Sequence, residues 1–193
     1  MSTPMTDAAR RTVAVGIGAL MLLMVVAPVG AQTLTQECEN PDAGYTIAFP
    51  SGWYVNEHVD GGDVADVVAC RFFSPEDFEV VPAAGVANVA IAIGLQAGGP
   101  PAEFAGEPIT VDVRAAFRGE EVMPAGADVP EGTRYYNYWI DLGDRTWLLA
   151  STSNGPTSVG DYDANRATLD AMMDSLDFGS ASLPDTAMAA PAR

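Results

Sequence analysis

Large apolar side chains alternate with small or polar ones along several short stretches of this 193-residue chain. A period of two is typical of β-strands with one buried face, and the Pro, Gly and Asp residues between the stretches are typical of turns. Residues 135–142 and 145–152 form the clearest pair, because they are rich in Tyr, Trp, Ile and Leu and flank a tight turn. Strands are also predicted at residues 44–49, 53–55, 67–73 and 88–95, with a weaker one at 120–129.

The connections between these strands carry their own signals. Residues 44–49 and 53–55 are predicted to pair as a hairpin, since Pro50-Ser51-Gly52 between them favours a turn. Ser74 and Asp77 stand at the N-cap and capping-box positions of a predicted short helix. Residues 102–118 fit either a strand or a helix, because an alternating apolar pattern runs into a helix-compatible segment.

One segment has the period of an amphipathic helix. Leu169, Met172, Met173 and Leu176 follow the i, i+3, i+4, i+7 spacing, and Asp161 is a suitable N-cap. The pattern predicts a helix over 161–175 that packs this stripe on an antiparallel sheet, with 176–178 leaving as a short strand.

The first 31 residues have the organisation of a secretory signal. Arg10 and Arg11 precede an uncharged apolar run from Val13 to Val29, and small residues follow Pro28. Cleavage is predicted after Ala31, and retention of residues 13–29 as a membrane anchor is the alternative. Either outcome exports the remainder, which we divide into an extended segment at 32–42, one domain at 43–179 and a disordered tail at 180–193.

Charge and composition exclude several classes of function. The chain has 26 acidic and nine basic residues, and every basic residue is Arg. This strongly negative balance excludes a nucleic-acid binder, which needs a cationic face. One His and two Cys are too few for a zinc site made of those ligands.

The two cysteines are predicted to form a disulfide. Export would place Cys38 and Cys70 in an oxidising compartment, and two is the number that leaves none unpaired. The bond would fasten the extended N-terminal segment to the strand at 67–73. Redox or metal chemistry by two free thiols is the rival interpretation, although no Cys-x-x-Cys motif is present.

Three stretches resemble the PsbP-like family, which comprises lumenal or secreted domains related to an extrinsic subunit of photosystem II. They are Tyr45-Thr46-Ile47-Ala48-Phe49-Pro50-Ser51-Gly52-Trp53, the pair Tyr135–Tyr138 and Trp147–Ala150, and Leu169–Phe178. The resemblance covers about residues 43–179. It implies an α+β fold of the α/β/α sandwich type, a central antiparallel sheet with helices on both faces, and a docking or assembly role without known catalysis. No functional residue carries over.

Two candidate sites lie close together in the sequence. Asp60, Asp63 and Asp66 on a Gly-rich loop offer oxygen ligands that could bind calcium or manganese, although their spacing does not fit an EF-hand loop. A solvated acidic turn is the simpler interpretation. His58 could act as a general base, but no Gly-x-Ser-x-Gly nucleophile motif accompanies it, and a surface histidine is the better interpretation.

A third candidate is a set of aromatic residues on the strongest predicted strands: Tyr135, Tyr136, Tyr138, Trp139 and Trp147. Alternation places Tyr136 and Tyr138 on one face, and Tyr135 and Trp139 on the other. The set could form a partner surface, or both faces could belong to the core.

These observations predict an exported, non-enzymatic PsbP-like domain that binds an unidentified protein partner or supports an assembly. No cofactor is expected beyond the calcium possibility. A calcium- or ligand-binding module using residues 60–66 is the first alternative. The second is a hydrolase whose carboxylates the sequence does not single out.

Overall fold

The computed structural model describes residues 32–62, 67–80, 88–127 and 129–179. The predicted signal at 1–31 and the predicted tail at 180–193 lie outside these residues, as do Asp63 and Asp66. The described residues include no helix with the length and apolar composition of a membrane-spanning segment. The strands are β1 (Leu34–Asn40), β2 (Tyr45–Pro50), β3 (Tyr54–Val55), β4 (Phe72–Ser74), β5 (Ile91–Ala97), β6 (Glu107–Val111), β7 (Arg114–Val122), β8 (Arg134–Gly143) and β9 (Thr146–Ser153). One helix, α1 (Tyr162–Asp174), follows them.

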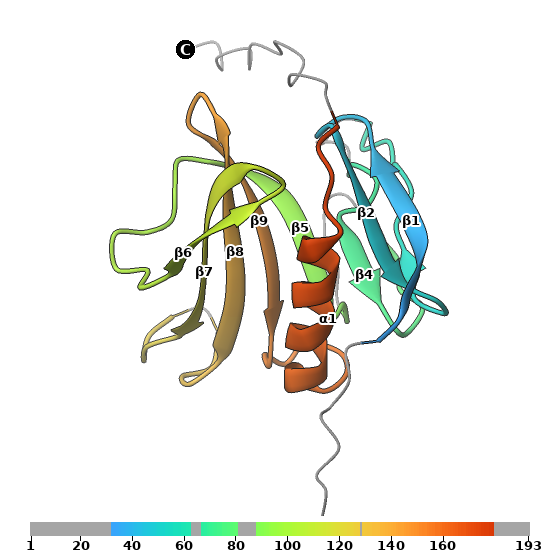
Figure 1. Cartoon of the computed structure of the whole chain (residues 1–193). Coiled ribbons are helices and arrows are strands. Elements are labelled where there is room, and N and C mark those ends of the chain that lie inside the picture. Colours follow the sequence, from blue (N-terminus) through green and yellow to red (C-terminus); the bar gives the residue numbers. More distant parts are fainter. Residues whose placement is uncertain (1–31, 63–66, 81–87, 128, 180–193) are drawn as a thin grey trace, which may run out of the picture.

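Seven strands form one antiparallel sheet in the order β3-β4-β5-β9-β8-β7-β6. The remaining two, β1 and β2, pair with each other as a separate antiparallel hairpin. Figure 1 shows α1 between this hairpin and the large sheet. The fold is therefore mostly β, with helix and hairpin together on one face.

The core lies where these three units meet. Ile47 and Phe49 of β2 are buried, as are Ile91 and Ile93 of β5 and Leu148 of β9. The centres of the Phe49 and Phe73 rings lie 5.6 Å apart, and this contact joins the hairpin to β4 of the large sheet. On the helix, the residues that face this core are Leu169, Met172 and Met173, followed by Leu176 just after its end.

The predicted C-terminal helix is confirmed. Asp161 is its N-cap, and the Asp161 carboxylate accepts a hydrogen bond from the Ala164 N–H at 2.9 Å. This bond satisfies one of the donors left unpaired at a helix start. The predicted exit strand at 176–178 is reduced to a single antiparallel bridge between Asp177 and Thr46.

The sandwich architecture implied by the family resemblance is wrong for the described residues. The opposite face of the sheet carries no helix there; a loop at residues 98–106 covers part of it instead. The Phe104 ring lies 6.5 Å from the Trp139 ring. A Cβ on Gly119 of β7 would lie only 3.0 Å from Gly106 Cα, so the loop backbone reaches the sheet because both residues are glycine.

Two local predictions are also wrong. Residues 44–49 do not pair with 53–55, because β2 pairs with β1 whereas β3 pairs with β4. No helix begins at Ser74 either: its hydroxyl accepts a bond from the Glu76 N–H, which closes a local turn rather than a helix. The ambiguous segment 102–118 contributes β6 and the first part of β7, and the weak strand predicted at 120–129 is only the end of β7.

The predicted disulfide is confirmed. The Cys38–Cys70 sulfurs lie 2.02 Å apart and the two Cα atoms 5.9 Å apart, inside the usual range for a disulfide. The bond joins β1 to the segment before β4. It indicates an oxidising compartment outside the cytoplasm.

In the turn between β6 and β7, Val113 has an unfavourable backbone conformation. Asp112 has φ 40° and Val113 has φ 60°, and the Val113 side chain is 94% exposed. A β-branched residue is strained when its φ and ψ angles lie in the left-handed region. Because the Val113 side chain is exposed, it makes no packing contacts that would offset this strain. The Asp112 carboxylate has a structural partner, because it accepts a bond from the Phe178 N–H at 2.7 Å.

We therefore expect Val113→Gly to raise the free energy of unfolding by about 0.5–1 kcal/mol, because Asp-Gly suits a two-residue hairpin turn. Urea unfolding would measure the change. Val122→Gly is the matched control: Val122 is 56% exposed at the end of the same β7 strand. This substitution should destabilise the protein. A loss of stability in Val113→Gly would contradict the strain argument.

Candidate functional site

The aromatic set divides between the two faces of the large sheet. Tyr136 and Tyr138 of β8 point toward α1 and are only 5% and 3% exposed. Tyr135, Trp139 and Trp147 lie on the opposite face and are half-buried. There Trp147 stacks on the Phe117 ring at 6.2 Å, and Trp139 packs against the loop at 98–106. The partner surface on these residues stays a prediction.

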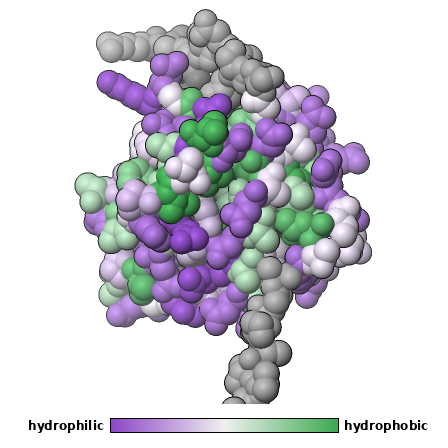
Figure 2. Space-filling view, in the orientation of Figure 1, coloured by the Kyte–Doolittle hydropathy of each residue, from purple (hydrophilic) through white to green (hydrophobic). Residues whose placement is uncertain are grey.

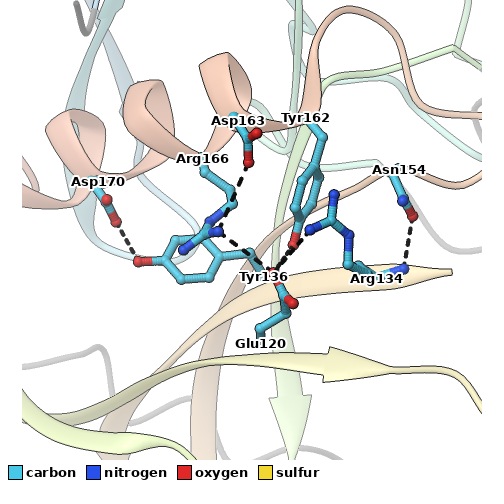
Figure 3. Close-up of polar contacts among 8 residues, drawn as sticks. All are labelled: Glu120, Arg134, Tyr136, Asn154, Tyr162, Asp163, Arg166 and Asp170. Carbon is cyan, nitrogen blue, oxygen red and sulfur yellow. Dashed lines mark hydrogen bonds and ion pairs between the residues drawn. The ribbon is translucent and has the colours of Figure 1, made fainter. Parts of the chain in front are cut away.

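On the α1 face, the two buried tyrosines belong to a polar group that we call the arginine–tyrosine cluster. Its members come from β6, β7, β8 and α1, and Figure 3 shows most of them. The strand register brings them together, because Arg118 and Glu120 of β7 pair with Tyr138 and Tyr136 of β8. The cluster comprises Glu107, Arg118, Glu120, Arg134, Tyr136, Tyr138, Tyr162, Asp163, Arg166 and Asp170.

Asp170 fastens α1 to the sheet through two phenols. The Tyr136 and Tyr138 hydroxyls both donate to Asp170 Oδ1, at 2.7 and 2.6 Å. Burial, and next the adjacent Asp170 carboxylate, raise the pKa of Tyr136 to about 12. The same two causes raise the pKa of Tyr138 further. Both phenols therefore stay neutral hydrogen-bond donors at physiological pH.

Glu120 is the centre of the other half of the cluster (Figure 3). Its Oε2 accepts a hydrogen bond from the Tyr162 hydroxyl at 2.8 Å, and it lies 3.5 Å from Arg166 Nη1 and 3.9 Å from Arg134 Nη1. The Arg134 guanidinium lies 4.3 Å from the centre of the Tyr162 ring, and the Arg166 guanidinium 4.4 Å from that of Tyr136. These cation–π contacts help to hold both arginines beside the aromatic rings.

A shallow depression of about 370 Å³ opens beside the cluster. Its lining consists of Glu107, Arg118, Gly119, Glu120, Tyr136, Arg166 and Asp170. Arg118 and Glu107 form an ion pair at 3.0 Å across two neighbouring strands. Hydrophilic side chains cover most of the side of the molecule seen in Figure 2, where hydrophobic ones form small separate groups.

This arrangement presents charged groups of both signs to solvent. The lining contains no Ser, Thr, Cys or His, so its only candidate nucleophiles and bases are the carboxylates and the Tyr136 phenol. It offers guanidinium donors and carboxylate acceptors held by neighbouring rings and by phenol hydrogen bonds. The carboxylates expected for a hydrolase do converge here, but in an open depression where each already accepts from an Arg or a Tyr.

Alkaline pH should destabilise the protein through its buried tyrosines. Burial raises the pKa of both Tyr45 and Tyr136 to about 12, whereas an unfolded tyrosine titrates near pH 10. Above about pH 10 the unfolded chain releases these protons first, so the stability present below pH 10 is lost as the pH rises, by up to about 1.4 kcal/mol per pH unit for each such tyrosine. Urea unfolding at a series of pH values, with tyrosinate absorbance, measures this loss.

The chain offers clean controls for that measurement. It contains no lysine, so tyrosine is the only side chain expected to titrate between about pH 10 and 12. Tyr45→Phe should flatten the alkaline loss of stability, and Tyr54→Phe, at an exposed position, is its matched control. Equal pH dependence in the two variants would show that buried phenols do not cause the loss.

The other predicted site residues lie apart from this cluster. Asp60 accepts a bond from the Gly62 N–H at 2.8 Å, which closes a turn, but Asp63 and Asp66 lie outside the described residues. Calcium binding by this loop therefore stays a prediction. His58 lies 3.7 Å from the Asp42 carboxylate, and both side chains are about half exposed. No group of three or more potential metal-ligating side chains occurs within the described ranges.

The arginine–tyrosine cluster was not predicted from the sequence. Each arginine of the cluster is isolated in the sequence, and only the pairing of β7 with β8 and the packing of α1 bring them together. A usable signal was the scarcity of cations in so acidic a chain: three of the six arginines in the described ranges, Arg118, Arg134 and Arg166, belong to this one cluster.

Comparison with known proteins adds no assignment to this geometry. No protein-family model matches the chain, and no curated protein is detectably similar to it. The resemblance to the PsbP-like family over residues 43–179 therefore stays a prediction from short aromatic motifs. The candidate site rests on the positions of its own side chains.

Proposed function

We propose that this chain is an exported, non-enzymatic binding module, and that the depression beside the arginine–tyrosine cluster is its binding site. The observation that carries the proposal is the gathering of scarce arginines with carboxylates around one open depression. Charged groups held in place on a rigid sheet and helix lose little conformational freedom when a ligand binds. The disulfide supports export, because such bonds persist in oxidising compartments.

The structure offers less to the alternative functions. A hydrolase needs a positioned nucleophile or a general acid–base pair beside a site that excludes water, whereas this depression is shallow and its carboxylates are engaged by Arg and Tyr. The aromatic face opposite α1 is partly covered by the protein's own loop at 98–106. The polar depression is therefore the preferred binding surface.

Backbone amide spectra of the exported protein, with its disulfide intact, test this proposal. The probes are sodium acetate, ethylammonium chloride, L-alanine, D-glucose and calcium chloride. We expect at least one organic probe to shift the Gly119 amide, which lies in the lining, in a saturable way. Chromogenic ester and glycoside substrates should show no turnover above the buffer blank.

Three outcomes would count against the proposal. If no organic probe shifts the Gly119 amide, the depression is not a binding site. Turnover of an ester or glycoside that Glu120→Gln abolishes would make the protein an enzyme. A calcium-dependent shift of the Gly62 amide, with Gly119 unaffected, would favour the loop at 60–66 as the binding site instead.

A further inference from the structure

The lining of the depression combines both signs of charge. Arg118 and Arg166 provide two cations, Glu107, Glu120 and Asp170 provide three anions, and the Tyr136 ring lies among them. We propose that the occupant is a small zwitterion, a molecule carrying one carboxylate and one ammonium group, such as a free amino acid. This inference rests on the proposed binding function and names its ligand class.

Both arginines have N–H groups that remain available to donate to a ligand carboxylate. Arg166 lies 3.5 Å from Glu120 and 4.0 Å from Asp163, both longer than a charge-assisted hydrogen bond of about 2.7–2.9 Å. Its guanidinium is therefore held in position by the cation–π contact with Tyr136 more than by hydrogen bonds. Arg118 uses Nη2 for Glu107 and also interacts with the Tyr138 phenol, and its side chain remains 36% exposed. A ligand carboxylate can accept from the donors that remain on both.

The three carboxylates of the lining each have an oxygen that remains available to accept from a ligand ammonium group. Both phenol bonds to Asp170 end on Oδ1, and all three contacts of Glu120 end on Oε2. Glu107 likewise uses only Oε2, toward Arg118. Each of the three therefore has one oxygen with no hydrogen-bond or ion-pair partner in the described part of the chain. An ammonium group has three donors and no acceptor, so it matches these oxygens.

The field of the whole protein selects against ligands of a single charge. The chain carries a formal net charge of −17, which repels a simple anion at long range. A simple cation would be attracted at long range but would meet the Arg118 and Arg166 guanidinium groups inside the depression. A zwitterion has no net charge, so the field opposes neither its approach nor its orientation over the paired charges.

Titration with L-alanine and its two half-molecules tests the inference through the Gly119 amide shift. Propionate lacks the ammonium group and ethylammonium lacks the carboxylate. We expect L-alanine to bind at least about tenfold more tightly than either half-molecule, because only it uses both sets of charges. Arg166→Gln, Arg118→Gln and Glu107→Gln should each weaken L-alanine about tenfold. Arg145→Gln and Asp174→Asn make the same charge changes outside the lining and should leave binding within about twofold.

The outcomes separate the ligand class from the binding function. If propionate or ethylammonium binds as tightly as L-alanine, the zwitterion inference is overturned while the proposed binding site stands. If L-alanine binds equally to all five variants, it binds elsewhere and the inference also fails. Glu107→Gln keeps the test informative if an arginine variant unfolds, because Glu107 is 67% exposed on the edge strand β6. If no organic probe shifts Gly119, the proposed function falls as well.

Discussion

Leu169→Ala is expected to lower the free energy of unfolding by about 2–5 kcal/mol. The Leu169 side chain is fully buried where α1 meets the large sheet and the β1–β2 hairpin. Truncation removes its favourable transfer from water and leaves a cavity that neighbours on three units cannot all relax to fill. Chemical unfolding in urea, followed by circular dichroism, measures the loss.

The same Leu→Ala substitution at the surface is the control, because it changes the side chain without removing core packing. Leu95 on β5 is 48% exposed, so Leu95→Ala should cost less than about 1 kcal/mol. Similar losses in the two variants, or a loss below about 0.5 kcal/mol at Leu169, would show that the helix does not pack through this stripe.

Removal of the Cys38–Cys70 bond is expected to cost about 3–4 kcal/mol. The bond spans a sequence separation of 32, and on the chain-entropy model a closed loop of that size restricts the unfolded state by this amount. A typical domain is stable by only about 5–15 kcal/mol, so the reduced protein should be only marginally folded. Urea unfolding of the oxidised and reduced forms gives the difference directly.

The Cys38→Ala/Cys70→Ala double variant controls for incomplete reduction. It should match the reduced protein, because both lack the crosslink and keep the other contacts at this junction. Those contacts include the Tyr45 hydroxyl bond to the Cys70 carbonyl and the Asn40 amide bond to the Ala69 carbonyl. Unchanged stability after reduction would mean that these bonds alone hold the hairpin in place.

Local patterns predicted the helix and the strongest strands well. Asp161, Leu169 and Met172 lie within a few turns of one another, so period and cap suffice to place α1. The β8–β9 pair was equally clear, since its two strands are long and adjacent in sequence. Both successes concern interactions between neighbours along the chain.

Pairing between distant segments was not predictable in the same way. Residues 53–55 are too few to specify a partner, and the strand there pairs with β4 rather than with β2. β2 pairs instead with a polar N-terminal segment whose Glu37 and Glu39 give no apolar alternation to identify a strand. The predicted second helical layer was wrong for another reason. It came from the family resemblance, whereas in the described residues a loop containing Phe104 and Gly106 covers part of that face.

The arginine–tyrosine cluster shows the same limit for function. Tyr136 and Tyr138 were singled out as aromatic residues, but their hydroxyl partner Asp170 lies on α1, 34 and 32 positions away. Nothing in the spacing of Arg118, Arg134 and Arg166 indicates that they converge. The antiparallel register of β7 with β8 brings Arg118 and Arg134 to one face of the sheet, and the packing of α1 adds Arg166.

The packing of α1 between the N-terminal hairpin and the sheet has a consequence for the order of folding. The Ala48 N–H on β2 donates to the Ser175 hydroxyl across 127 positions, and Thr46 pairs with Asp177 beside it. These contacts of β2 with the C-terminal segment therefore cannot form until nearly the whole domain has been synthesised. Such long-range closure slows folding. A chain that folds late stays unfolded for longer. We therefore expect it to be compatible with a translocation channel that accepts only unfolded polypeptide, because export can take place before α1 packs against the hairpin.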